Sequence, residues 1–268
     1  MLFNTGETGE DLKLKYNPDG SMLRKMQLRL LDMLLYLDKV CKEQNITWRL
    51  DGGNILGAVR HGGFIPWDDD VDVVLEKKEF KRLCKYLLEH PHPQYKLQCN
   101  KTDKGYYCHG WATLRDMNSE YIQDSRLHNA RKYRGAQIDL FRYENHINRR
   151  LGLWFGRIET YNIQHFVGIK PQLAQLVYYM QEYVTEPIFK LLGYPFSSSK
   201  EYAHSYGFVH CHIPSDVLIP YRPILFEGHE FPGPAQPDLF LKLLYGDYLE
   251  LPPIEKRGGH DAKYKIWD

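Results

Sequence analysis

The sequence lacks a large net charge, a cysteine framework and a long apolar segment. Its 35 Lys and Arg residues stand against 34 Asp and Glu residues, so no overall field would hold the chain on nucleic acid. The five cysteines are an odd number without any CxxC spacing, which argues against a disulfide framework or a zinc knuckle and indicates reduced thiols. No apolar run approaches the roughly 18 residues that a membrane-spanning helix needs.

These absences predict the location of the protein in the cell and the partners that it does not bind. Residues 1–20 are polar and contain glycine, whereas an export signal would be apolar there. We therefore expect a cytoplasmic protein that binds no nucleic acid and whose membrane contact, if any, is peripheral and at the inner face. A hydrophobic fraction of 43% is ordinary for a globular chain and allows a sizeable core.

Hydrophobic periodicity predicts a mixed α/β part followed by a mainly helical part. Helices are predicted at 21–43, 54–60, 77–90 and 237–245, with two or three more over 150–192. Strands are predicted at 46–51, 71–75, 95–99, 107–114 and 136–141, and a hairpin over 224–231 turns at Gly228. We expect a catalytic core at 1–145, and a helical region with a loop-like tail at 146–268 that completes the cleft of one compact α/β unit.

Acidic residues are unusually dense between Asp51 and Val73, where five carboxylates fall within 23 positions. Such crowding of like charge is costly unless a cation is present. In a strand, side chains two apart share a face, so Asp70 and Asp72 would present their carboxylates together. Mg²⁺ or Mn²⁺, completed by water and substrate phosphates, is the ion that such a pair would hold.

A glycine turn and a further acid accompany this pair. Gly52 and Gly53 allow close backbone approach, and the helix that follows, with Asn54 near its start, offers amide groups and its positive dipole end to an anion. Asp139 lies between Ile138 and Leu140, so it would sit inside a strand next to the first pair. Three carboxylates and a glycine turn indicate metal-dependent phosphate transfer.

This pattern resembles the nucleotidyltransferase fold of the polymerase β type, and more narrowly the LicD family of phosphocholine transferases and fukutin-related ribitol-phosphate transferases. The residues that carry the resemblance are the run from Asp51 to Val73, the segment from Gly135 to Phe141, and the tail, in which Tyr245-Gly-Asp-Tyr248 precedes Leu251-Pro-Pro and Lys256-Arg257. The helical stretch at 150–200 carries little of it. The resemblance implies a mixed sheet of nucleotidyltransferase type with packed helices and an additional helical region.

The same resemblance implies a reaction. A phosphorylated alcohol would pass from a CDP-linked donor, such as CDP-choline, to the hydroxyl of a glycan or lipid-linked saccharide, with CMP released. Asp70 and Asp72 would hold the metal, Asp139 would be a further ligand or receive the acceptor proton, and Asp68 would bind a second ion or order the loop. The diphosphate would be met by cationic side chains. The candidates for this role are Arg60, Lys256 and Arg257.

Several alternatives stay open on the sequence alone. A true nucleotidyltransferase would transfer NMP and release pyrophosphate, and a noncatalytic protein could keep the site to bind a nucleotide or a glycan. A DxD sugar transferase is disfavoured because it needs no glycine turn upstream. Asp51 is either a helix cap or a ligand, Asp69 is expected to point away into solvent, and Trp67 either stacks on a base or choline group or packs in the core.

Overall fold

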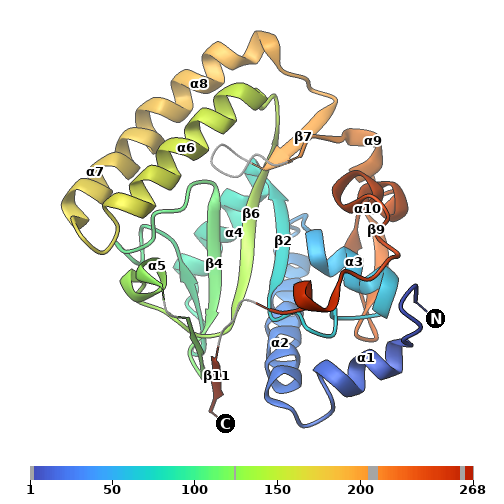
Figure 1. The fold of residues 1–268 in the computed structure, drawn as a ribbon. Helices are drawn as coiled ribbons and strands as arrows, with labels where there is room; N and C mark the ends of the chain where they lie inside the picture. The colour runs from blue at the N-terminus through green and yellow to red at the C-terminus, as the bar shows by residue number, and fades with distance from the viewer. Residues whose placement is uncertain (1–2, 124, 205–210, 260–262, 268) are drawn as a thin grey trace.

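The computed structural model describes residues 3–123, 125–204, 211–259 and 263–267. Its centre is a mixed seven-stranded sheet in which β1, β2, β6, β4 and β3 follow one another, while β7 and β8 extend it from the end of β6 (Figure 1). Only the β2–β6 pair in this sheet is parallel among the described strands. The strands are β1 (Arg49–Leu50), β2 (Val71–Glu76), β3 (Tyr95–Gln98), β4 (Trp111–Asp116), β6 (Gln137–Asn145), β7 (Glu201–His204) and β8 (Ile213–Pro214). The predicted mixed α/β class is confirmed.

The centre of the sheet forms where the sequence is richest in β-branched and aliphatic residues. Val71, Val73 and Val74 of β2 are fully buried, as are Ile138 and Leu140 of β6. Such side chains pack well on a pleated surface that is covered on both faces. The predicted strands at 46–51 and 107–114 are shorter than expected, since only Arg49–Leu50 and Trp111–Asp116 pair in the sheet.

Helices from the first half of the chain cover this sheet. The helix α2 begins after Ser21, whose side chain accepts a hydrogen bond from the Arg24 amide at 3.2 Å. The helix α4 contacts β2 and β6 and lies behind them in Figure 1. The helices of this part are α1 (Gly9–Tyr16), α2 (Met22–Glu43), α3 (Gly52–His61), α4 (Lys77–Glu89) and α5 (Arg126–Ala130).

The stretch predicted as helical forms an outer layer. The helix α6 (Arg149–His165) contacts α7 (Pro171–Met180) and α8 (Glu186–Gly193), and a π-helical turn (Gln181–Thr185) joins these two into one long rod (Figure 1). A 3-10 turn (Tyr194–Phe196) ends the layer. Within the described residues, no helix is long and apolar enough to cross a membrane.

The C-terminal part returns to the sheet. The predicted hairpin is confirmed as β9 (Arg222–Phe226) and β10 (His229–Gly233), with Gly228 at a φ of 78° in its turn. The short α9 (Ser215–Leu218), α10 (Pro237–Tyr245) and a 3-10 turn (Ile254–Lys256) flank this hairpin. The prediction of a loop-like tail was wrong in part, because β11 (Lys263–Ile266) pairs with β5 (Ser119–Ile122).

A buried cluster of charges ties the outer layer to the end of β6. The Glu144 carboxylate lies 2.7 Å from Arg142, 2.8 Å from Lys190 of α8 and 3.4 Å from Lys77 of α4. Burial would raise the pKa of Glu144, but the three cations lower it to about 2. One carboxylate therefore neutralises cations from three elements.

We expect Glu144→Gln to lower the free energy of unfolding by about 2 kcal/mol at neutral pH, because Arg142 and Lys190 would keep only Glu186 as a carboxylate partner. The carboxylate stabilises the fold above its ordinary pKa of 4.5, and this contribution is lost as the pH falls towards 2. Urea unfolding of both proteins should show a difference that shrinks over that range. A difference that stays constant with pH would contradict the ion-pair account.

Candidate active site

The parallel pairing of β2 with β6 sets Asp72 directly beside Asp139. Neighbouring residues in register project from the same face of a sheet, so the two carboxylates are adjacent. Burial raises the pKa of Asp72 far above its ordinary range, and the negative charges of Asp70 and Asp139 raise it further. The sheet thus brings together acids that are 67 positions apart in the sequence.

Asp139 is held by neutral donors. The Thr113 hydroxyl on β4 donates to one carboxylate oxygen at 2.9 Å, and the Gln137 amide donates to the other at 3.1 Å. Burial raises the pKa of Asp139, while the nearby Arg115 guanidinium and the Thr113 hydrogen bond act in the opposite direction. A buried carboxylate with a raised pKa is suited to accept a proton. The role of Thr113 could not be read from the sequence, because it depends on the β4–β6 register.

The start of β2 is fixed by α3. The Asn54 side chain accepts a hydrogen bond from the Asp72 amide at 2.6 Å and donates to the Asp70 carbonyl at 3.4 Å. The Asp51 amide donates to the Asp72 carbonyl at 3.0 Å. The predicted substrate residue Asn54 therefore has a positioning role here, since its buried amide group is committed to the backbone that carries the acids.

The glycine turn faces the same acids. Gly52 has a φ of 49°, and a Cβ built on it would lie 3.6 Å from both an Asp72 carboxylate oxygen and the Tyr245 hydroxyl. A Cβ on Gly53 would lie 3.2 Å from an Asp68 oxygen. Asp68 therefore lies on the side of the turn that faces the other acids, which is compatible with both of its predicted roles, binding a second ion or ordering the loop. Tyr245, which the sequence marked only as part of the tail motif, therefore lies at the glycine turn beside Asp72.

Asp51 is neither a solvated acid nor a helix cap. It occupies the N-cap position of α3, yet its side chain makes no capping hydrogen bond. Instead it accepts hydrogen bonds from Arg49 at 2.7 Å and pairs with the His204 ring at 2.9 Å. Burial would raise the pKa of Asp51, but the Arg49 charge and the His204 contact hold it below its usual range.

The prediction that Asp69 points into solvent was wrong. Asp69 is buried and accepts hydrogen bonds from the hydroxyls of Tyr121 on β5 and Tyr264 on β11. It lies before β2, which begins at Val71, and the tail covers it: a Cβ on Gly259 would come within 2.9 Å of its carboxyl group. Asp69 therefore ties the C-terminal strand to the acidic segment.

Two of the side chains that were predicted to bind substrate, Arg60 and Trp67, make contacts within the protein instead. Arg60 is buried, and its guanidinium donates to the carbonyls of Tyr248 and Glu250 at 2.9 and 3.1 Å. Trp67 is 8% exposed and meets the Tyr16 ring edge-on at 5.1 Å, so the core alternative for Trp67 describes the structure. A role of either residue in binding diphosphate or choline stays a prediction.

The two basic residues of the tail differ from each other. The Arg257 guanidinium donates to Glu7 at 2.6 Å and to the Pro252 carbonyl at 2.7 Å, and it lies over the Trp67 ring. Lys256 is exposed and belongs to the neighbouring 3-10 turn. Of the two, Lys256 is the side chain whose charge solvent can reach, so it is the better placed to meet an anionic substrate.

The acids fit a divalent cation only in part. Across the residues that the structure describes, no three His, Cys, Asp or Glu side chains lie close enough to form a metal site on their own. The predicted convergence of Asp70, Asp72 and Asp139 on one ion is therefore not preformed. Mg²⁺, however, commonly takes one or two carboxylates and completes its shell with water and substrate phosphates. Asp70 and Asp72 could supply the one or two carboxylates of this mode. The bound metal itself stays a prediction.

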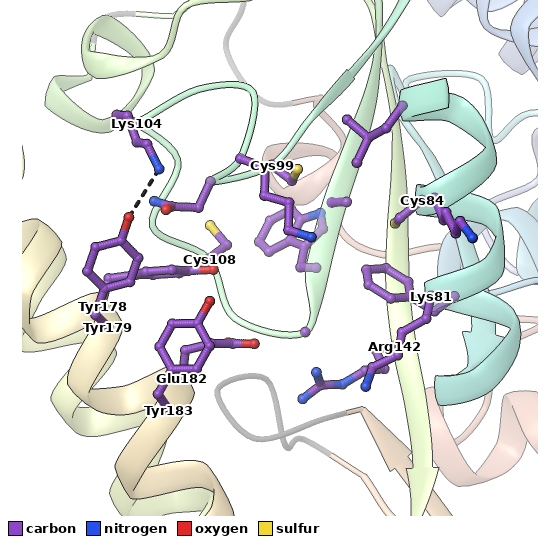
Figure 2. A pocket seen from close by; sticks show the side chains of 18 of the residues that line it. Lys81, Cys84, Cys99, Lys104, Cys108, Arg142, Tyr178, Tyr179, Glu182 and Tyr183 are labelled. Atoms are coloured by element: carbon purple, nitrogen blue, oxygen red, sulfur yellow. Dashed lines mark hydrogen bonds between the residues drawn. The ribbon is translucent and has the colours of Figure 1, made fainter. Parts of the chain in front are cut away.

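A cavity of about 690 Å³ lies beside this cluster, between α4, residues 99–112 and α7. Figure 2 shows Lys81 and Lys104 on opposite sides of it, with Tyr183 at its edge. Trp111 lines the cavity, and its side chain is also close enough to Asp139 to act against the burial-raised pKa of that carboxyl group. The cavity and the acid cluster therefore share a wall at Trp111.

Comparison with known proteins shows which family and which relatives the chain resembles. Residues 45–157 match the family described as LicD/FKTN/FKRP, nucleotidyltransferase domain. The lipopolysaccharide cholinephosphotransferase LicD of Haemophilus influenzae is 27% identical over 267 residues, which covers 89% of this chain and 95% of that protein. Human ribitol 5-phosphate transferase FKRP is 47% identical over 38 residues, covering 14% of this chain and 8% of that protein.

The matched span contains the whole acid cluster. Asp51, Asp68, Asp70, Asp72 and Asp139 all lie between residues 45 and 157, together with the glycine turn. The resemblance predicted from the sequence is confirmed: residues 45–157 match the LicD family model, and a LicD cholinephosphotransferase aligns with most of the chain.

Proposed function

We propose that this protein transfers a phosphorylated alcohol of the phosphocholine type from a CDP-linked donor to a glycan hydroxyl and releases CMP. The observation that carries the proposal is the pairing of Asp72 with Asp139 opposite the Gly52 turn, inside the family-matched span. The relative that aligns with most of the chain is named a cholinephosphotransferase, which supports the donor class. The mixed sheet is compatible with a fold of nucleotidyltransferase type, which belongs to the same proposal.

Asp70 and Asp72 would hold Mg²⁺ or Mn²⁺, with Asp68 and Asp139 close by. The cation would neutralise the negative charge that develops on the phosphate oxygens during transfer. Asn54 keeps the two acids in place through the backbone of β2. The amides at the start of α3, next to the left-handed Gly52, would receive the donor diphosphate.

The transfer step balances without any further reactant. The acceptor hydroxyl oxygen forms a bond to the phosphorus that bears the alcohol, and the bond from this phosphorus to the CMP oxygen breaks. We assign the hydroxyl proton to the Asp139 carboxylate, because its pKa is raised by burial and it lies beside Asp72. Thr113 and Gln137 orient that carboxylate.

The proposal is tested by incubating the protein with CDP-choline, CDP-ethanolamine, CDP-ribitol and CDP-glycerol in turn, with a lipopolysaccharide or lipid-linked saccharide acceptor. We expect CMP to appear with Mg²⁺, and the alcohol phosphate to be found on the acceptor. Pyrophosphate release from CTP would instead support NMP transfer. Binding of nucleotide without any product would support the noncatalytic alternative. Either of these two outcomes would overturn the proposal.

A further inference from the structure

The outer helical layer carries an exposed apolar surface. Of the 28 large apolar side chains that are exposed among the described residues, 15 lie between residues 153 and 196. Trp154 is 58% exposed on α6, and Leu191 is 76% exposed on α8. Apolar surface that is this concentrated marks an interaction site in a protein that otherwise buries its core.

The apolar side chains follow the helical repeat. On α6 the exposed positions Trp154, Ile158 and Tyr161 are spaced by four and three, while Phe155 and Asn162 of the same helix are buried. On the α7–α8 rod, the exposed apolar side chains Met180 and Val184 are four positions apart, about one helical turn. Both helices lie on the outside of the molecule, with the sheet on their other side (Figure 1). We call this outer face of residues 153–196 the α6–α8 face.

The charges around the α6–α8 face have one sign. Every charged side chain that is exposed between residues 149 and 200 is basic. They are Arg149, Arg150, Arg157, Lys170 and Lys200. The three acids of this stretch are withdrawn from solvent into ion pairs or hydrogen bonds with the interior. They are Glu159, Glu182 and Glu186.

We propose that the α6–α8 face docks on the surface of a lipid bilayer that contains anionic lipids. Exposed Trp, Tyr and Leu side chains beside Arg and Lys are the composition of helices that lie in the membrane interface. Arg157 lies over the Trp154 ring at 5.3 Å, so a cation and an interfacial aromatic side chain are presented together. The first exposed acid beyond this stretch is Glu201, so cations dominate the α6–α8 face; such a face fits an anionic lipid surface, whereas a second copy would oppose it with the same cations.

The docked face would lie next to the cavity. Tyr179 and Tyr183 are exposed residues of the same stretch, and they line the cavity beside Trp111, so the cavity opens next to the α6–α8 face (Figure 2). A substrate held in the bilayer would therefore reach the cavity from its membrane side. The docking itself does not depend on the proposed reaction, so the two can be tested separately.

The test is cosedimentation of the full chain with vesicles. We expect binding to phosphatidylcholine vesicles that contain phosphatidylglycerol, weaker binding to phosphatidylcholine alone, and loss of binding in high salt. The double variant Trp154→Ser and Leu191→Ser should lower the partition coefficient about tenfold or more. The matched control is Leu14→Ser with Leu225→Ser, which are exposed elsewhere and should leave binding unchanged.

A second pair of variants separates charge from apolar contact. Arg149→Gln with Arg150→Gln should lower binding to the anionic vesicles about thirtyfold, because two cations near such a surface are removed and each contributes on the order of 1 kcal/mol. Lys25→Gln with Lys39→Gln, two exposed lysines on α2, should not. Sedimentation velocity runs alongside. No binding to anionic vesicles, equal losses in test and control pairs, or a dimer dissociated by the Trp154 and Leu191 changes without vesicle binding would each overturn the proposal.

Discussion

Replacing Asp72 with asparagine should lower the rate of phosphoalcohol transfer about a thousandfold, because an interaction of several kcal/mol with the metal-bound phosphate would be lost. Asp72 stands at the centre of the acid cluster: Asp70, Asp139, Asp51 and Asp68 all raise its pKa in addition to burial. The measurement is CMP release from CDP-choline at saturating donor and Mg²⁺. The effect should fall on kcat more than on the KM for the donor.

The matched control for this change is Asp216→Asn, an exposed acid on α9. It removes the same charge from the chain but none from the cluster, so we expect full activity. Omitting Mg²⁺ should reduce the wild-type rate to that of the Asp72 variant. Retention of activity in Asp72→Asn with an intact fold would show that Asp72 does not act at the metal.

Replacing Arg49 with methionine should destabilise the fold by about 3–5 kcal/mol, because the buried Asp51 carboxylate would lose its cation. Arg49 is fully buried, lies against the rings of Tyr143 and Phe240 at 5.1 Å each, and donates to Asp51 at 2.7 Å. Methionine keeps much of the volume but none of the charge. A fall of about 10 °C in the midpoint of thermal unfolding is the expected size in a chain of this length.

Two further variants make the Arg49 result interpretable. Arg222→Met removes an exposed arginine of β9 and should change the midpoint little. Adding Asp51→Asn to Arg49→Met should recover part of the lost stability, since no charge is then left without its partner. If the double variant is no more stable than Arg49→Met alone, the loss comes from packing against the two rings and not from the ion pair.

Local patterns predicted the parts of the site that are close in sequence. The alternation around Val71 and Val73 placed the strand that begins after Asp70, and the Gly52–Gly53 pair marked the turn before α3. These features depend on neighbours only a few positions away, so periodicity and turn chemistry are sufficient to find them. The adjacent position of Asp139 followed from the resemblance and from its apolar flanks, and the β2–β6 register gives it a physical basis.

The parts that escaped prediction depend on contacts across the chain. His204 reaches Asp51 from β7, and no feature near residue 204 indicates this. The burial of Asp69 requires Tyr264 in a tail that pairs with β5, and the alternation at Lys263–Ile266 covers only four residues. Arg60 and Arg257 were predicted to bind the diphosphate and the role of Arg49 was missed, because a sequence does not show which backbone carbonyls or acids will surround a guanidinium.

The most direct test of the acid site is the position of a bound cation. Crystals of the protein soaked with Mn²⁺ and CDP-choline, measured at the manganese absorption edge, should show an anomalous peak in contact with the carboxylates of Asp70 and Asp72 and with an oxygen of the diphosphate. A peak elsewhere in the chain, or a bound donor whose diphosphate lies away from the Gly52 turn with no cation beside Asp72, would contradict the account.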